Sequence, residues 1–80
     1  MNAAYDELLD FVTSAPTLEQ ILDFSHSKTT LDRVDYLLDA AEAETITEAE
    51  DGELREFLRA NDVMEALKVR ARKRLGIPEE

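Results

Sequence analysis

Residues 47–76, TEAEDGELREFLRANDVMEALKVRARKRLG, form the stretch that decides the fold. Its apolar side chains recur every three or four residues, as on one face of an α-helix, and keep one phase across Asn61-Asp62. They are Leu54, Phe57, Leu58, Met64, Leu67, Ala71 and Leu75. The pattern predicts one long helix over 48–75. A break at Asn61, with Asn61 or Asp62 as a new N-cap, is the alternative.

Both ends of this predicted helix carry recognisable signals. Thr47 and Glu50 have the spacing of a capping box, in which each side chain accepts a hydrogen bond from the other residue's backbone. At the other end, Gly76 can adopt the left-handed conformation that ends helices, and Pro78 prevents continuation. These signals bound the helix independently of its apolar pattern.

Three shorter helices are expected upstream, over 3–14, 17–25 and 30–43. Pro16 ends the first, and Thr17 with Gln20 forms another capping box that begins the second. The polar run 25–30 is expected to be a linker. The third helix has the clearest apolar stripe, made of Leu31, Val34, Leu37, Leu38 and Ala41.

The chain is therefore expected to be all-α, a small bundle of about four helices forming one domain over 1–80. Two helical hairpins, or three shorter helices packed across the long one, would both bury these stripes. A chain of 80 residues without cysteine has a small core and no disulfide to support it, so a second copy is an expected source of stability. The long helix would then pair with another through Phe57, Met64, Leu67 and Ala71.

Charge is unevenly distributed along the sequence. The net charge is −10, yet the segment 68–74 contains five basic and no acidic residues: Lys68, Arg70, Arg72, Lys73 and Arg74. One interpretation is that these side chains complement the helix dipole and pair with acidic helices. The other is an electrostatic contact with a partner. Nucleic acid is disfavoured, because the rest of the chain would repel phosphates and no aromatic residue lies among the basic ones.

Rows of carboxylates at helical spacing suggest a different partner, a basic protein. The rows are Asp32, Asp35, Asp39 and Glu42, and Glu50, Glu53 and Glu56. Such rows would speed the encounter with a basic surface. Solubility is the simpler explanation of any single carboxylate.

No pattern of catalysis, cofactor binding or metal binding is evident. His26, the sole histidine, lies between Ser25 and Ser27, and adjacent side chains rarely form a nucleophile and base, so a solvated linker or cap is the simpler interpretation. The acidic segment 48–52 lacks the alternating oxygen ligands of an EF-hand loop. We expect no enzyme activity, no cofactor and no metal site.

The segment from Leu31 to Arg72 resembles a family of short, uncharacterised bacterial helical proteins. The matching elements are Arg33-Val34, Leu37-Leu38, Thr45-Ile46-Thr47, Glu50, Glu53-Leu54, Phe57-Leu58 and Leu67-Lys68-Val69-Arg70-Ala71-Arg72, with 18–24 resembling the family's leader. Glu44 stands where the family usually has a turn glycine, and Glu48 where it has a proline. The resemblance implies a helical organisation and a bacterial cytoplasmic origin, and it implies no activity.

Together these patterns favour a non-enzymatic, cytoplasmic interaction protein that self-associates through its C-terminal helix and modulates a protein partner. No apolar run is long enough to span a membrane. The alternative is a nucleic-acid-associated regulator that uses the basic segment 68–74.

Overall fold

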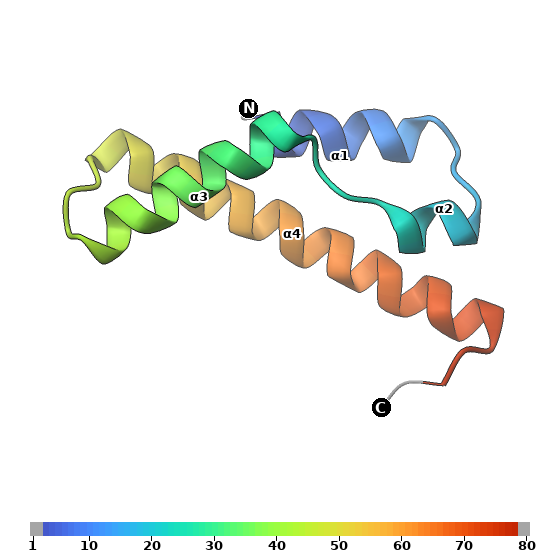
Figure 1. The fold of residues 1–80 in the computed structure, drawn as a ribbon. Coiled ribbons are helices and arrows are strands. Elements are labelled where there is room, and N and C mark those ends of the chain that lie inside the picture. The colour runs from blue at the N-terminus through green and yellow to red at the C-terminus, as the bar shows by residue number, and fades with distance from the viewer. Residues whose placement is uncertain (1–2, 79–80) are drawn as a thin grey trace.

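The computed structural model describes residues 3–78 and contains four α-helices and no strand in that range (Figure 1). They are α1 (Ala3–Thr13), α2 (Leu18–Asp23), α3 (Lys28–Glu42) and α4 (Glu48–Leu75). The prediction of a small all-α bundle with a long last helix is confirmed. None of these helices is long and apolar enough to cross a membrane.

Helix α4 is continuous for 28 residues, through Asn61-Asp62. Thr47 is its N-cap in a complete capping box with Glu50, and Gly76 closes it with φ 75°. The helix does not break at Asn61 because Ala60 and Met64, on either side, are both buried in one core cluster with α1. Packing on both sides of the polar pair holds the backbone in one helix.

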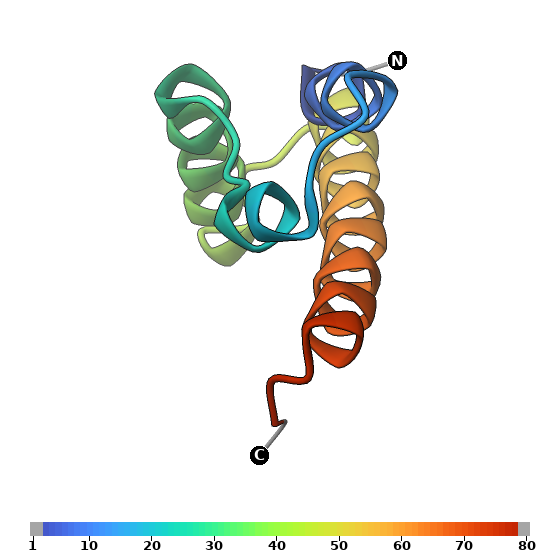
Figure 2. The ribbon, with the colours of Figure 1, turned by 90° about the vertical axis from the view of Figure 1, so that its right-hand side faces the viewer.

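The three shorter helices pack across α4, which is one of the two arrangements expected from the sequence. Figure 2 shows α1 and α4 on one side of the molecule and α3 on the other. One core cluster joins α1 to α4 through Ala4, Leu8, Ala60 and Met64. The second joins α3 to α4 through Val34, Leu37 and Leu54. Phe57 packs against both clusters and so links the two halves of the core.

Helix α3 begins earlier than expected. Ser27 is its N-cap and accepts a hydrogen bond from the Thr30 backbone N–H, so the helix starts at Lys28 rather than at residue 30. Part of the segment predicted to be a linker therefore belongs to the helix. The second helix is shorter than the predicted 17–25, with Thr17 as N-cap and Phe24 as C-cap.

Two turns place non-glycine residues in the left-handed region. Ala15 has φ 56°, so the residue before Pro16 leaves helical geometry through this region rather than through an extended one. Glu44 has φ 59° between α3 and α4. The turn thus has a conformation that glycine would adopt more easily.

Candidate functional site

The densest polar cluster lies where α1 meets the start of α3, and the carboxylate of Glu7 is its centre. Glu7 Oε2 accepts hydrogen bonds from the hydroxyls of Ser27 at 2.6 Å and Thr30 at 3.1 Å. Glu7 Oε1 accepts from the Ser27 backbone N–H at 3.2 Å and lies 2.9 Å from His26 Nδ1. A residue of α1 therefore caps the N-terminus of α3, where a negative charge is favourable.

Burial of this carboxylate raises its pKa, but the hydrogen bonds from Ser27, His26 and Thr30 together outweigh burial and lower the pKa of Glu7 below its usual value. The carboxylate form is therefore the one that the cluster stabilises. His26 lies beside it with its ring 5.1 Å from that of Phe24 and 5.4 Å from that of Phe57, centroid to centroid.

This geometry corrects the interpretation of His26 as solvated, because its exposed fraction is only 9%. Sequence reasoning missed its partner, which is 19 residues away on another helix. The Ser27 hydroxyl donates to Glu7 rather than to the histidine ring, so serine and histidine converge on one carboxylate instead of forming a nucleophile and base. The arrangement serves as a helix cap and an anchor between helices.

The residues predicted to mediate self-association lie in the core of the single chain. Met64 and Ala71 are 4% and 1% exposed, and Phe57 and Leu67 are half-buried against the cluster between α1 and α4. The prediction that this face of α4 is an open dimer seam is therefore wrong. The shorter helices of the same chain cover it.

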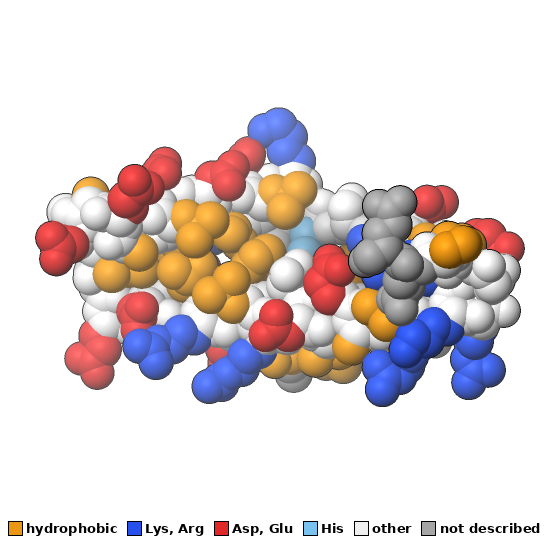
Figure 3. Space-filling view, turned by 90° about the horizontal axis from the view of Figure 1, so that it is seen from below, with side chains coloured by type: hydrophobic (Ala, Val, Ile, Leu, Met, Phe, Trp, Pro, Cys, Tyr) orange, Lys and Arg blue, Asp and Glu red, His pale blue; other side chains and the backbone are white. Residues whose placement is uncertain are grey.

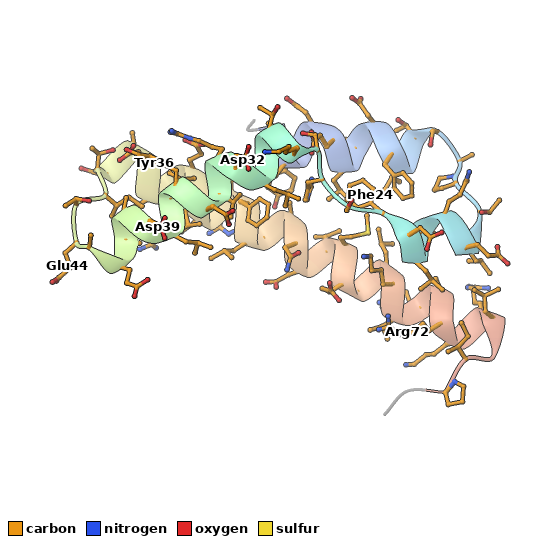
Figure 4. All side chains as sticks on the ribbon, viewed as in Figure 1. Phe24, Asp32, Tyr36, Asp39, Glu44 and Arg72 are labelled. Atoms are coloured by element: carbon orange, nitrogen blue, oxygen red, sulfur yellow. The ribbon has the colours of Figure 1, made fainter. Side chains whose placement is uncertain are left out.

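The basic segment divides into one structural residue and four surface residues. Lys68 donates a hydrogen bond from Nζ to the carbonyl oxygen of Phe24, the C-cap of α2, at 2.9 Å. Arg70, Lys73 and Arg74 are exposed and Arg72 is half-buried below α4 (Figure 4). None of these four forms an ion pair with any residue in the range 3–78.

The two predicted rows of carboxylates have different roles. Glu53 pairs with Arg33 of α3 through two hydrogen bonds of 2.8 and 2.9 Å, and Glu50 accepts one from the Tyr36 hydroxyl at 2.9 Å. These contacts fasten α3 to α4 and occupy Glu50 and Glu53, whereas Glu56 of the same row forms no ion pair within residues 3–78. In the other row, Asp32 pairs only with Lys28 one turn away. Asp35, Asp39 and Glu42 are exposed and have no ion pair within the described residues.

The hydrogen bonds to Glu50 and Glu53 shift the pKa values of these carboxyl groups. A hydrogen bond from Arg33 lowers the pKa of Glu53, and the Thr47 backbone N–H lowers that of Glu50. The Glu50 carboxylate in turn raises the pKa of Tyr36, because it accepts a hydrogen bond from the protonated hydroxyl and its negative charge opposes ionisation.

An exposed apolar surface runs along the underside of the molecule, between α3 and α4 (Figure 3). Leu31 and Leu38 are seven residues apart on α3 and therefore share a face, next to the buried Val34. Leu58 lies one turn beyond the buried Leu54 on α4. We call Leu31, Leu38, Leu58 and the half-buried Ala41 the apolar strip.

A small pocket on the other side of the hairpin offers no comparable surface. It lies between α1, α3 and α4, is lined mainly by Ala4, Val34, Leu37 and Phe57, and has a cavity volume of about 30 Å³. That is room for about one water molecule. No group of three or more potential metal ligands occurs within residues 3–78.

No protein-family model matches this sequence, and no curated protein or solved structure matches it either. The resemblance to a family of short bacterial helical proteins stays a prediction.

Proposed function

We propose that this protein is a non-enzymatic interaction protein whose docking surface is the apolar strip between α3 and α4. The observation that carries the proposal is the exposure of Leu31, Leu38 and Leu58, at 42%, 46% and 46%, beside the small core. Contiguous apolar side chains rimmed by charge are typical of surfaces that bind other proteins. Helix α4 keeps a part in self-association, but through Leu58 rather than through Met64 or Ala71.

The charges around the strip support binding to a protein rather than to a small molecule. Asp35, Asp39 and Glu42 lie on α3 next to the strip with no ion pair among the described residues. A net charge of −10 would attract a partner with a basic surface and speed its encounter. We propose that the protein modulates this partner in the cytoplasm.

Site-specific photo-cross-linking in cells that express the full chain tests this function. A photoreactive residue at Leu38 or Leu58 should form cross-linked protein species. The matched control is Leu9, which lies on α1 and is 44% exposed. Cross-links at Leu38 and Leu58 but not at Leu9 would support the proposal. Their absence at Leu38 and Leu58 would reject it.

Nucleic-acid binding by the basic segment is the second candidate, and the exposure of Arg70, Lys73 and Arg74 without ion pairs in the described region favours it. The net charge of −10 argues against it, because it would repel phosphates, and so does the hydrogen bond that Lys68 donates to the carbonyl oxygen of Phe24. The test is binding of duplex DNA and single-stranded RNA across a salt series. Binding that weakens with salt and is lost in Arg70→Gln/Arg74→Gln would support it, and no binding at low salt would reject it.

A further inference from the structure

The imidazole of His26 has one ring nitrogen bound and the other free. Nδ1 lies 2.9 Å from Oε1 of Glu7. Hydrogen bonds lower the pKa of Glu7, so its carboxyl group is ionised at neutral pH and can only accept a hydrogen bond. Nδ1 therefore carries a proton, and the neutral ring has its lone pair on Nε2.

Nε2 of His26 reaches the surface of the molecule. It forms no hydrogen bond with any residue from 3 to 78, and no buried side-chain nitrogen or oxygen in that range lacks a hydrogen-bond partner. Nε2 is thus in contact with solvent, although the residue as a whole is only 9% exposed. Figure 3 shows part of the histidine side chain, in pale blue, on the underside of the molecule. The small exposed part of His26 therefore includes the nitrogen with the lone pair.

The imidazole ring is held in one orientation. Phe24 and Phe57 pack against it, with ring centroids 5.1 and 5.4 Å away. The carboxylate of Glu7 is itself fixed by hydrogen bonds from Ser27 and Thr30. A carboxylate that orients Nδ1–H in this way leaves Nε2 directed outward as a nucleophile, and it stabilises the positive charge that the ring acquires when Nε2 forms a bond.

We propose that Nε2 of His26 is a phosphoryl-acceptor site, which takes its phosphoryl group from an activated phosphate donor, an acyl phosphate or a phosphoramidate. The lone pair of Nε2 attacks phosphorus, the bond from phosphorus to the leaving group breaks, and the leaving group departs with that electron pair. Nδ1 keeps its proton, so the phosphorylated ring is positively charged and faces the carboxylate of Glu7. Docking at the apolar strip is not required for this reaction.

The surroundings of His26 suit a phosphoryl group better than a metal ion. No group of three or more potential metal ligands occurs within residues 3–78, so a metal ion on Nε2 would lack a set of ligands from the described part of this chain. Lys68 donates a hydrogen bond to the carbonyl oxygen of Phe24, two residues before His26. Lys28 follows two residues after His26, and its ion pair with Asp32 is exposed. These two positive charges would attract a phosphate donor to this segment, although the net charge of the chain is −10.

Reaction of the full chain with potassium phosphoramidate is the test, with a peptide of residues 23–29 as the unfolded reference. The chain has one histidine, so every phosphohistidine formed is His26. The folded chain should react at least as fast as the peptide, and NMR should place the phosphoryl group on Nε2 alone, because Nδ1 is engaged by Glu7. The peptide, in which both ring nitrogens are free, should give both products. A histidine that only fills space in the core would react more slowly in the folded chain than in the peptide.

Glu7→Gln tests the carboxylate, with circular dichroism to verify folding. Its amide oxygen can still accept from Nδ1, but the negative charge is lost, so the reaction should slow about tenfold or more. A purely structural role predicts the opposite, since a loosened cap would expose the ring and speed the reaction. Asp10→Asn removes the same charge from an exposed position of α1 and should leave the rate unchanged. Gly76→Ala, which weakens the end of α4, should also leave it unchanged unless the reaction proceeds through unfolded molecules.

Reaction of the folded chain at Nε2 as fast as in the peptide, together with a slower Glu7→Gln, would support the phosphoryl-acceptor site. Slower reaction than in the peptide, a product at Nδ1, or a Glu7→Gln variant as fast as wild type would overturn it. So would an equal loss in Asp10→Asn or an acceleration in Gly76→Ala. If Glu7→Gln does not fold, the comparison of the wild-type chain with the peptide decides alone.

Discussion

Lys68 of α4 donates a hydrogen bond from Nζ to the backbone oxygen of Phe24, 2.9 Å away, and so satisfies the C-terminal end of α2. The two residues are 44 positions apart in the sequence. This bond helps to hold the shortest helix, which contains no buried residue of its own, against α4.

Lys68→Met should therefore destabilise the protein by about 1 kcal/mol, because the carbonyl of Phe24 loses a charged donor in a partly buried position. Chemical denaturation would measure the change in the free energy of unfolding. Lys73→Met is the matched control, since Lys73 is exposed on the same helix, and its effect should stay within about 0.5 kcal/mol. Equal effects of the two substitutions would contradict a structural role for Lys68.

Glu7→Gln should destabilise the protein by about 1–3 kcal/mol, because an amide nitrogen would face the donors of Ser27 and Thr30. Hydrogen exchange should increase most in the first turn of α3. Asp10→Asn on the same helix is the control, as Asp10 is exposed and forms no ion pair with any residue from 3 to 78. Retention of wild-type stability in Glu7→Gln would show that the cap is dispensable.

The Glu7 cluster should also make stability depend on pH. Because the folded state lowers the pKa of Glu7 below 4.5, the unfolded state binds the proton more readily, and the stabilisation is lost as pH falls through the folded pKa. The difference in the free energy of unfolding between wild type and Glu7→Gln should be full above about pH 5 and shrink below the ordinary pKa of 4.5. Comparing the two proteins removes the effect of overall charge. A difference that does not vary with pH would rule out this role of the carboxylate.

Ala60→Leu should destabilise the protein by about 1–3 kcal/mol, because Ala60 is 0% exposed where α1 lies on α4 and a larger side chain would push the helices apart. Ala66→Leu makes the same change at an exposed position of the same helix and should be nearly neutral. Thermal denaturation of both variants measures the contrast. A neutral Ala60→Leu would mean that α1 does not pack closely on α4.

Glycine should have opposite effects at two turns. Glu44→Gly should stabilise the protein by up to about 1 kcal/mol, since residue 44 has φ 59° and glycine adopts this region without strain. Gly76→Ala should destabilise it by about 1 kcal/mol, because residue 76 ends α4 with φ 75°. Both changes are read from the midpoint of denaturant unfolding. Stabilisation by both substitutions, or by neither, would contradict the turn geometry.

Much of the fold was predictable from the sequence because its signals are local. The capping boxes at Thr17 and Thr47, the terminal Gly76 and the apolar period of α4 each involve residues within about one turn of one another. The start of α3 was missed, since Ser27, Thr29 and Thr30 are all reasonable caps locally. Only the carboxylate of Glu7, 20 residues earlier, favours Ser27.

The sequence by itself determined that the chain is helical and where three of its helices begin. It left a break at Asn61 open, and the packing of Ala60 and Met64 against α1 decides that the last helix is continuous. Tertiary structure alone decided which apolar residues are covered. Met64 and Ala71 share the periodicity of a dimer seam, yet α1 and α2 bury that face, whereas Leu38 and Leu58 have the same helical spacing and stay exposed. Periodicity shows that a helix has an apolar face, and the placement of neighbouring helices decides whether the same chain or another covers it.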